Sequence, residues 1–184
     1  MPIQTPICDF GQKALPFELK STDNKIISLD NIMGENGTLI MFICNHCPYV
    51  KAVTKEIVED CNELKKIGIN SVAICSNDAV NYPDDSFDNM IKFSNDNQFN
   101  FPYLQDETQE IAKAYDAVCT PDFFGYNKDL GLQYRGRLRE LKNFVPVKDG
   151  ESDLLKAMKQ IAETGKGPQN QIPSAGCGIK WKYD

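Results

Sequence analysis

Hydrophobic residues change their spacing several times along the chain, and each change predicts a different element. Residues 16–29, PFELKSTDNKIISL, alternate apolar and polar positions on both sides of the turn-forming STDN, which predicts a β-hairpin. Residues 37–43, GTLIMFI, are almost continuously apolar, as in a strand buried on both faces. From Pro48 to Gly68 apolar residues recur every three or four positions, which is typical of an amphipathic helix with a proline in its first turn.

The rest of the chain alternates between strand-like and helix-like patterns. Residues 69–75, INSVAIC, predict a second buried strand, so that 37–75 forms a strand–helix–strand unit with parallel strands. The later segments predict a loop, a short helix, a brief strand, a helix, an antiparallel hairpin and a last helix, over 76–85, 86–97, 99–104, 108–118, 122–137 and 152–165. We therefore expect an α/β fold with a mixed sheet, with one domain over 1–164 and an irregular Gly- and Pro-rich extension over 165–184.

Composition and charge narrow the class of protein. A chain of 184 residues, 41% hydrophobic, can bury roughly 70% of its unfolded surface and needs no disulfides for stability. The net charge of −6 argues against nucleic acid or an anionic membrane as partner. The N-terminus has no signal-peptide pattern, and the longest apolar run, LIMFIC, is far below the ~20 residues of a membrane span. We expect a cytoplasmic protein, whose thiols stay reduced.

Two of the seven cysteines form a C-x-x-C pair. In ICNHCPYV, Cys44 ends the predicted strand, and Cys47 stands at the start of the predicted helix with Pro48 next to it. Open α/β sheets carry their sites at this edge. A helix N-terminus stabilises an anion by about 0.3–1 kcal/mol, up to about 2 in favourable geometry, so it can lower a thiol pKa from about 8.5 to about 7. His46, the only histidine, would add to this as an imidazolium ion.

Three interpretations of the pair remain open: a reactive dithiol, core packing, or half of a zinc site. Free cysteine is among the most buried residue types, which permits a core role. A structural zinc ion needs four ligands, usually from two paired half-sites, and the sequence has no second C-x-x-C and no paired histidine. The reactive dithiol is therefore favoured, with His46 either supporting it or a bystander. We expect no metal and no cofactor.

Several motifs together resemble a known family: LIMFICNHCPYV, SVAICSND, FPYLQDETQEIAKAY, CTPDFFGYN and YRGR. They resemble the thioredoxin-like superfamily, and more closely its redoxin branch related to alkyl hydroperoxide reductase and thiol-specific antioxidant (AhpC/TSA) proteins. The likeness covers about residues 8–164, and the tail SAGCGIKWK resembles the ending of other members of that branch. It implies a thioredoxin-like fold, with a central mixed sheet flanked by helices and an N-terminal β-hairpin, and antioxidant activity.

The resemblance also implies roles for single residues. Cys44 would be the attacking, more exposed thiolate, and Cys47 the resolving thiol. Pro121 falls where such proteins hold a cis-proline facing the dithiol, and Thr120 would offer its backbone to an incoming peptide or thiol. His46 resembles the residue before the second cysteine in oxidising and isomerising relatives.

The sequence departs from the peroxidase members of this branch at two points. Those relatives carry Thr or Ser where Cys44 stands and their peroxidatic cysteine where Cys47 stands. They also place an arginine beside the thiolate, where this chain has Thr120-Pro121. The arginines further along the chain are expected to be surface charges: Arg135, Arg137 and Arg139.

These observations support one main hypothesis and two alternatives. The main hypothesis is a cytosolic thiol–disulfide oxidoreductase that exchanges disulfides with protein or small-molecule thiols and is served by a cellular dithiol reductant. One alternative is a peroxiredoxin-like peroxidase acting on a peroxide, with Cys47 peroxidatic and Cys44 resolving. The other, of a different class, is a non-catalytic thioredoxin-like interaction module.

The remaining chemistry-bearing residues receive weaker predictions. Cys61 is expected in the core because it lies about 21 Å along the helix from the pair, at 1.5 Å per residue. Cys75 and Cys119 approach the same sheet edge, so a relaying third thiol stays open there beside simple packing, whereas Cys8 and Cys177 are not placed. Acidic residues around the loops are expected to be caps and solvated faces: Asp84, Asp85, Asp88, Asp106 and Glu107.

Overall fold

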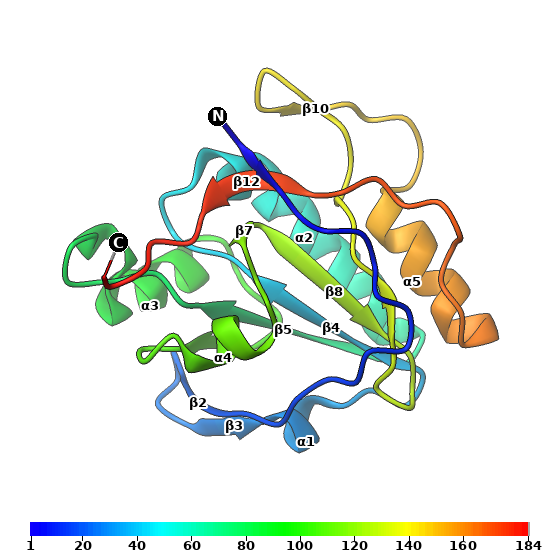
Figure 1. Cartoon of the computed structure of the whole chain (residues 1–184), viewed down its shortest axis with the longest axis horizontal. Helices are drawn as coiled ribbons and strands as arrows, with labels where there is room; N and C mark the ends of the chain where they lie inside the picture. The colour runs from blue at the N-terminus through cyan, green and yellow to red at the C-terminus, as the bar shows by residue number, and fades with distance from the viewer. Residues whose placement is uncertain (184) are drawn as a thin grey trace.

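The computed structural model describes residues 1–183, and its centre is a seven-stranded sheet with helices on both faces (Figure 1). The strand order is β3-β2-β6-β5-β4-β8-β9. The strands are β2 (Glu18–Ser21), β3 (Ile26–Ser28), β4 (Gly37–Phe42), β5 (Ile69–Cys75), β6 (Tyr103–Gln105), β8 (Asp122–Tyr126) and β9 (Leu132–Tyr134). Strands β4, β5 and β6 are parallel, and the other pairings are antiparallel. The predicted mixed sheet and both predicted hairpins, β2–β3 and β8–β9, are confirmed.

The helices form two layers because alternate residues of the central strand face opposite sides. The helices are α1 (Leu29–Ile32), α2 (Pro48–Lys66), α3 (Phe87–Asp96), α4 (Glu110–Ala114) and α5 (Asp153–Thr164), with a 3-10 turn, η1, over Pro83–Asp85. Leu39 and Met41 of β4 pack in the core that contains side chains of α2, α3 and α5. Ile40 and Phe42 pack in the core that contains side chains of α1 and α4. Helix α4 is shorter than expected, since Asp116 adopts a positive φ of 57° soon after its end.

The C-terminal tail contains a strand, although the sequence predicted an irregular segment. Strand β12 (Ala175–Gly178) lies between β1 (Ile3–Gln4) and β7 (Cys119–Thr120) in a separate three-stranded antiparallel sheet. Figure 1 shows this red segment beside the blue N-terminus. A Cβ atom on Gly176 would lie 1.9 Å from the carbonyl oxygen of Thr120, so glycine permits the close approach. The division of the chain at residue 164 stays a prediction.

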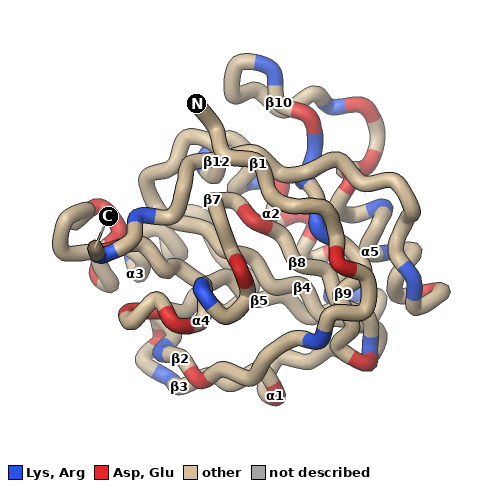
Figure 2. Tube along the Cα trace, viewed as in Figure 1, with Lys and Arg blue, Asp and Glu red and all other residues tan. Residues whose placement is uncertain are grey.

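Charged residues are distributed along the whole trace, with both signs interspersed (Figure 2). A further small sheet, β10 (Leu141–Lys142) with β11 (Val145–Pro146), lies in the loop before α5. Within residues 1–183, none of the helices has the length and apolar character needed to cross a bilayer.

Two of the three arginines expected on the surface are buried. Arg135 is 5% exposed and pairs with Asp122 at 2.9 Å. Arg139 is 8% exposed and donates to both carboxylate oxygens of Glu56, at 2.6 to 2.9 Å. Only Arg137 keeps partial exposure. The expectation fails because a buried guanidinium is tolerated when its charge and hydrogen bonds are matched by a carboxylate.

Candidate active site

The cysteine pair lies at the carboxyl edge of β4, where the strand passes into α2. Cys47 is the N-cap residue of α2 and Pro48 is its first residue, as the sequence predicted. Both cysteines are free thiols, and they are 1% and 0% exposed, Cys44 and Cys47 respectively. The order of exposure is the expected one, but the chain around the pair covers both sulfur atoms almost completely.

Thr120 contacts both sulfur atoms. Its hydroxyl oxygen lies 3.4 Å from Sγ of Cys44, and its carbonyl oxygen accepts a hydrogen bond from Sγ of Cys47 at 3.2 Å. The Thr120–Pro121 peptide bond is cis. The structure thus brings together four residues separated by about 75 positions that the sequence had assigned to one site.

The ionisations of the two thiols depend on each other, and the negative charge is favoured on Cys47. The pKa of Cys47 is lowered, chiefly because the Cys44 thiol donates a hydrogen bond to it, with further donation from the Cys177 thiol and the Val50 N–H. The Thr120 side chain also lowers the pKa of Cys47, whereas burial raises it. The donors and the helix N-terminus together outweigh burial. The directions of the two pKa shifts therefore favour Cys47 as the thiolate, whereas the expected role of Cys44 as the attacking thiol stays a prediction.

Asp85 is a site residue that the sequence interpretation missed. Its carboxylate is buried, 1% exposed, and accepts hydrogen bonds of 2.8 Å from the Asn45 N–H and from the Asn77 side chain. It therefore fixes the backbone between the two cysteines. The pKa of Cys44 is raised, first because it donates to Cys47, then by burial and by the charge of Asp85. No local pattern marks this residue, since it reaches the site across 40 positions.

His46 lies beside Asp85 at the edge of the site. Its Nδ1 atom is 2.6 Å from Oδ2 of Asp85, and the two atoms do not form a hydrogen bond of acceptable geometry. The ring is 28% exposed and stacks parallel to Tyr82, at 6.3 Å between centroids. Ligand atoms of Cys44, His46 and Asp85 all lie within 4.8 Å of one another. Sulfur, nitrogen and oxygen ligands of this kind suit zinc.

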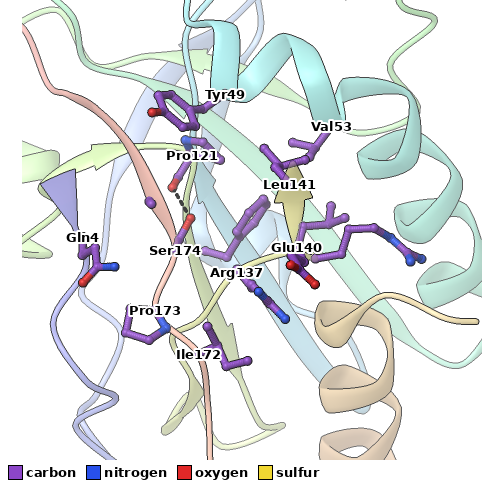
Figure 3. Close-up of a pocket in the computed structure, with 14 residues that line it drawn as sticks. Gln4, Tyr49, Val53, Pro121, Arg137, Glu140, Leu141, Ile172, Pro173 and Ser174 are labelled. Atoms are coloured by element: carbon purple, nitrogen blue, oxygen red, sulfur yellow. Dashed lines mark hydrogen bonds between the residues drawn. The ribbon is translucent and has the colours of Figure 1, made fainter. Parts of the chain in front are cut away.

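A pocket of about 230 Å³ opens beside Pro121 (Figure 3). Tyr49 and Val53 of α2 form one wall, and Ile172 from the tail lies on the other side. Arg137 contributes a positive charge to the lining. Mostly apolar walls with a few polar groups are typical of ligand sites, so a substrate side chain could bind next to Pro121.

The other cysteines fall into two groups. Burial raises the pKa of Cys61 and of Cys75 to about 12 and raises that of Cys119 further, so these thiols are protonated at neutral pH. Cys61 is a core residue, as expected. Cys177 is different: it pairs in register with Thr120 across β12 and β7, and its side chain helps to lower the pKa of Cys47. The sequence did not place it, because nothing local specifies which strand a short Gly-rich segment will join.

Comparisons with known proteins identify the family and the fold. The model of the AhpC/TSA family matches residues 10–140, which contain both cysteines, Asp85 and Thr120-Pro121. Among curated proteins, none matches the chain. An uncharacterised conserved protein from Geobacillus kaustophilus is 41% identical, with 100% of this chain and 98% of that chain covered and a TM-score of 0.94. A hypothetical protein from Sinorhizobium meliloti is 29% identical, with both chains fully covered (100%) and a TM-score of 0.90.

More distant structures share the fold alone. Peroxidoxin BcpB from Mycobacterium tuberculosis is 13% identical over 83% of this chain and 92% of that chain, with a TM-score of 0.59. The thioredoxin domain of a thiol-disulfide oxidoreductase from Bacteroides vulgatus is also 13% identical, over 68% and 86% of the two chains, with a TM-score of 0.58. The fold is thioredoxin-like, as expected.

Proposed function

The chain belongs to the AhpC/TSA family, and on that premise we propose that it is a thiol–disulfide oxidoreductase whose redox centre is the Cys44–Cys47 dithiol. The observation that supports this proposal most directly is the position of the two sulfur atoms. They lie at the N-terminus of α2, and both contact oxygen atoms of one residue, Thr120. Exchange through a mixed disulfide requires two thiols held near each other, one of them ionised. The lowered pKa of Cys47 meets the second requirement.

In the proposed reaction Cys47 is the nucleophile and Cys44 the resolving thiol, the reverse of the order expected from the sequence. The Cys47 thiolate attacks one sulfur of a substrate disulfide, forms a mixed disulfide and releases the first substrate thiolate. Cys44 then loses its proton and attacks Cys47, which releases the second thiol and closes the Cys44–Cys47 disulfide. The dithiol supplies two electrons, and a cellular dithiol would return the enzyme to its reduced form.

Two features support the order of these steps. Asp85 helps to raise the pKa of Cys44, so Cys44 stays protonated while Cys47 attacks. A ring nitrogen of His46 lies within 4.8 Å of the Cys44 sulfur and is the base we assign to its later deprotonation. The pocket beside Pro121 would hold a side chain of the substrate.

Stopped-flow reaction with the disulfide 5,5′-dithiobis(2-nitrobenzoate) tests the assignment. Cys47→Ser should slow the first release of the nitrothiobenzoate product by more than about 100-fold, because thiolates and not hydroxyls attack disulfides. Cys44→Ser should slow it by less than about tenfold, since a hydroxyl still donates to Cys47. Cys8→Ser, which removes a partly buried thiol near the N-terminus, is the matched control.

Two outcomes would contradict the proposal. If Cys44→Ser were the slow variant, the two roles would be exchanged. If neither variant differed from the control, the dithiol would be inert and the interaction-module alternative would be correct.

A second candidate, thiol peroxidase activity, is favoured by the thiolate at a helix N-terminus in a chain of this family. Cys47 would attack hydrogen peroxide, giving a sulfenic acid and hydroxide, and Cys44 would then displace water to close the disulfide. Against it, Arg135 and Arg139 are held in ion pairs with carboxylates and are not free to polarise a peroxide. A rate of oxidation by hydrogen peroxide no faster than that of free cysteine would exclude this activity.

A further inference from the structure

The tail strand β12 brings a third thiol to the dithiol. Cys177 stands opposite Thr120 in the antiparallel β12–β7 pairing, and Thr120 is the residue whose oxygen atoms contact both Cys44 and Cys47. The side chains of Cys177 and Cys47 interact, which helps to lower the pKa of Cys47 and to raise that of Cys177. It packs against the core cluster that contains the dithiol. Three thiols are thus grouped around one threonine.

Hydrogen bonds on both sides of Cys177 fix its position. Before it, Ser174 Oγ donates to the Pro121 carbonyl at 2.7 Å. After it, the Ile179 N–H donates to the Val118 carbonyl at 3.2 Å. The segment therefore holds Cys177 in register, and Gly176 lets the strand lie close to Thr120, where a Cβ atom would be 1.9 Å from the carbonyl oxygen.

Exposure separates Cys177 from the other two thiols. Cys44 and Cys47 are buried, whereas Cys177 is partly exposed. A large reductant reaches a sulfur atom that is partly open to solvent more readily than one that is buried. Cys177 therefore lies on the route between the dithiol and the outside.

We propose that Cys177 is a third redox-active cysteine, which takes over the disulfide from the buried pair and presents it to an external dithiol protein. The proposal rests on the proposed function, because it needs a Cys44–Cys47 disulfide as its starting point. Cys177 gives up its proton and its thiolate attacks Sγ of Cys47. The Cys47–Cys177 bond forms, the Cys44–Cys47 bond breaks, and Cys44 leaves as a thiolate that takes up a proton. The exchange conserves the oxidation level, so it needs no further oxidant.

A reduced Cys44→Ser variant of the full chain tests the exchange without the competing resolving thiol. Treated with oxidised glutathione, Cys47 should first carry glutathione, and Cys177 should then displace it to give a Cys47–Cys177 disulfide, seen by mass spectrometry of non-reduced peptides. In the Cys44→Ser/Cys177→Ser variant the glutathione adduct should persist at least about tenfold longer. Cys44→Ser/Cys8→Ser is the matched control and should behave like Cys44→Ser. Far-UV circular dichroism checks that each variant is folded.

The outcomes separate this inference from the proposed function. An adduct at Cys47 whose lifetime does not change when Cys177 is replaced would overturn the third-cysteine proposal alone. If no adduct formed at Cys47 in any variant, the proposed function would fail and this inference with it.

A second measurement uses the otherwise intact chain. Reduction of the oxidised Cys177→Ser protein by a bacterial thioredoxin should be slower than wild type by at least about tenfold, whereas reduction by dithiothreitol, which is small, should change by less than about twofold. Equal slowing with both reductants would indicate a structural effect of the substitution and would contradict the proposed relay.

Discussion

Helix α2 carries several buried acidic groups, and two of them, Glu56 and Cys47, are stabilised in different ways. In its middle, Glu56 accepts hydrogen bonds from the guanidinium of Arg139, which also donates to the carbonyls of Val147 and Gly150. At its N-terminus, Cys47 is stabilised by thiol and backbone donors. A guanidinium does not lose its proton in proteins, so Arg139 keeps its positive charge beside Glu56. A thiol can pass its proton to a neighbour, so the negative charge on Cys47 can move and the thiolate can react.

Breaking the Arg139–Glu56 ion pair should therefore lower the stability of the protein more than a change at Cys47. Arg139→Met removes the cation and leaves Glu56 buried without a partner, which should lower the free energy of unfolding by about 3–5 kcal/mol. Urea unfolding measures this, with Arg137→Met as the control, because the more exposed Arg137–Asp153 pair should contribute less than about 1 kcal/mol. A loss below 1 kcal/mol for Arg139→Met would show that the protein does not depend on this pair.

The next largest effect is expected on the pKa of Cys47 when Cys44, its main hydrogen-bond donor, is replaced. A hydrogen bond to a charged group is worth about 1.5–3 kcal/mol, so Cys44→Ala should raise the pKa of Cys47 by about one to two units. Thiolate absorbance at 240 nm as a function of pH measures the shift. An unchanged pKa would mean that the helix N-terminus and the remaining donors alone stabilise the thiolate.

The same titration predicts how stability depends on pH in the reduced wild-type protein. Because folding lowers the pKa of Cys47 below its ordinary value of 9.0, the thiolate stabilises the folded state above pH 9, and this contribution is lost as the pH falls through the folded pKa. The contribution of Cys47 to the free energy of unfolding should thus rise with pH between these two values. Subtracting the profile of Cys47→Ser isolates it, and parallel profiles would contradict the assignment.

Asp85 should have a smaller effect on the second ionisation of the pair. Asp85→Asn keeps an oxygen acceptor for the Asn45 N–H and removes the charge that raises the pKa of Cys44. That pKa should fall by about half to one unit. Asp84→Asn, at the exposed neighbouring acid, should leave it unchanged. Equal shifts in both variants would point to a general charge effect rather than to the buried carboxylate.

The smallest effect on stability is expected at Ser174, whose side chain holds the C-terminal tail against the rest of the protein. Ser174→Ala removes the hydrogen bond to the Pro121 carbonyl and should lower the free energy of unfolding by about 1 kcal/mol. Thermal unfolding measures it. An unchanged unfolding temperature would show that water replaces the hydroxyl and that the strand pairing alone holds the tail.

The local sequence pattern predicted much of the fold. Of the site, it predicted the cysteine pair but not Asp85 or Cys177. The strand–helix junction at the cysteine pair follows from a change in the spacing of hydrophobic residues. This spacing is a property of residues that are close together in the sequence. The predicted AhpC/TSA family, whose model matches residues 10–140, and the predicted thioredoxin-like fold are confirmed. The tail strand was missed because its Gly-rich segment has no alternation, and its pairing depends on two distant strands.

The sequence by itself determined where the two thiols stand, at a strand end and a helix start, because those positions depend on spacing within a few turns of chain. Only the tertiary structure decided which groups surround each thiol and in which direction they shift its pKa. Asp85 and Cys177 reach the cysteine pair across about 40 and 130 positions of chain, and hydrophobic periodicity carries no information about such partners. The chemistry of the pair depends on these long-range contacts, since they supply the donors and the charge that shift its pKa values.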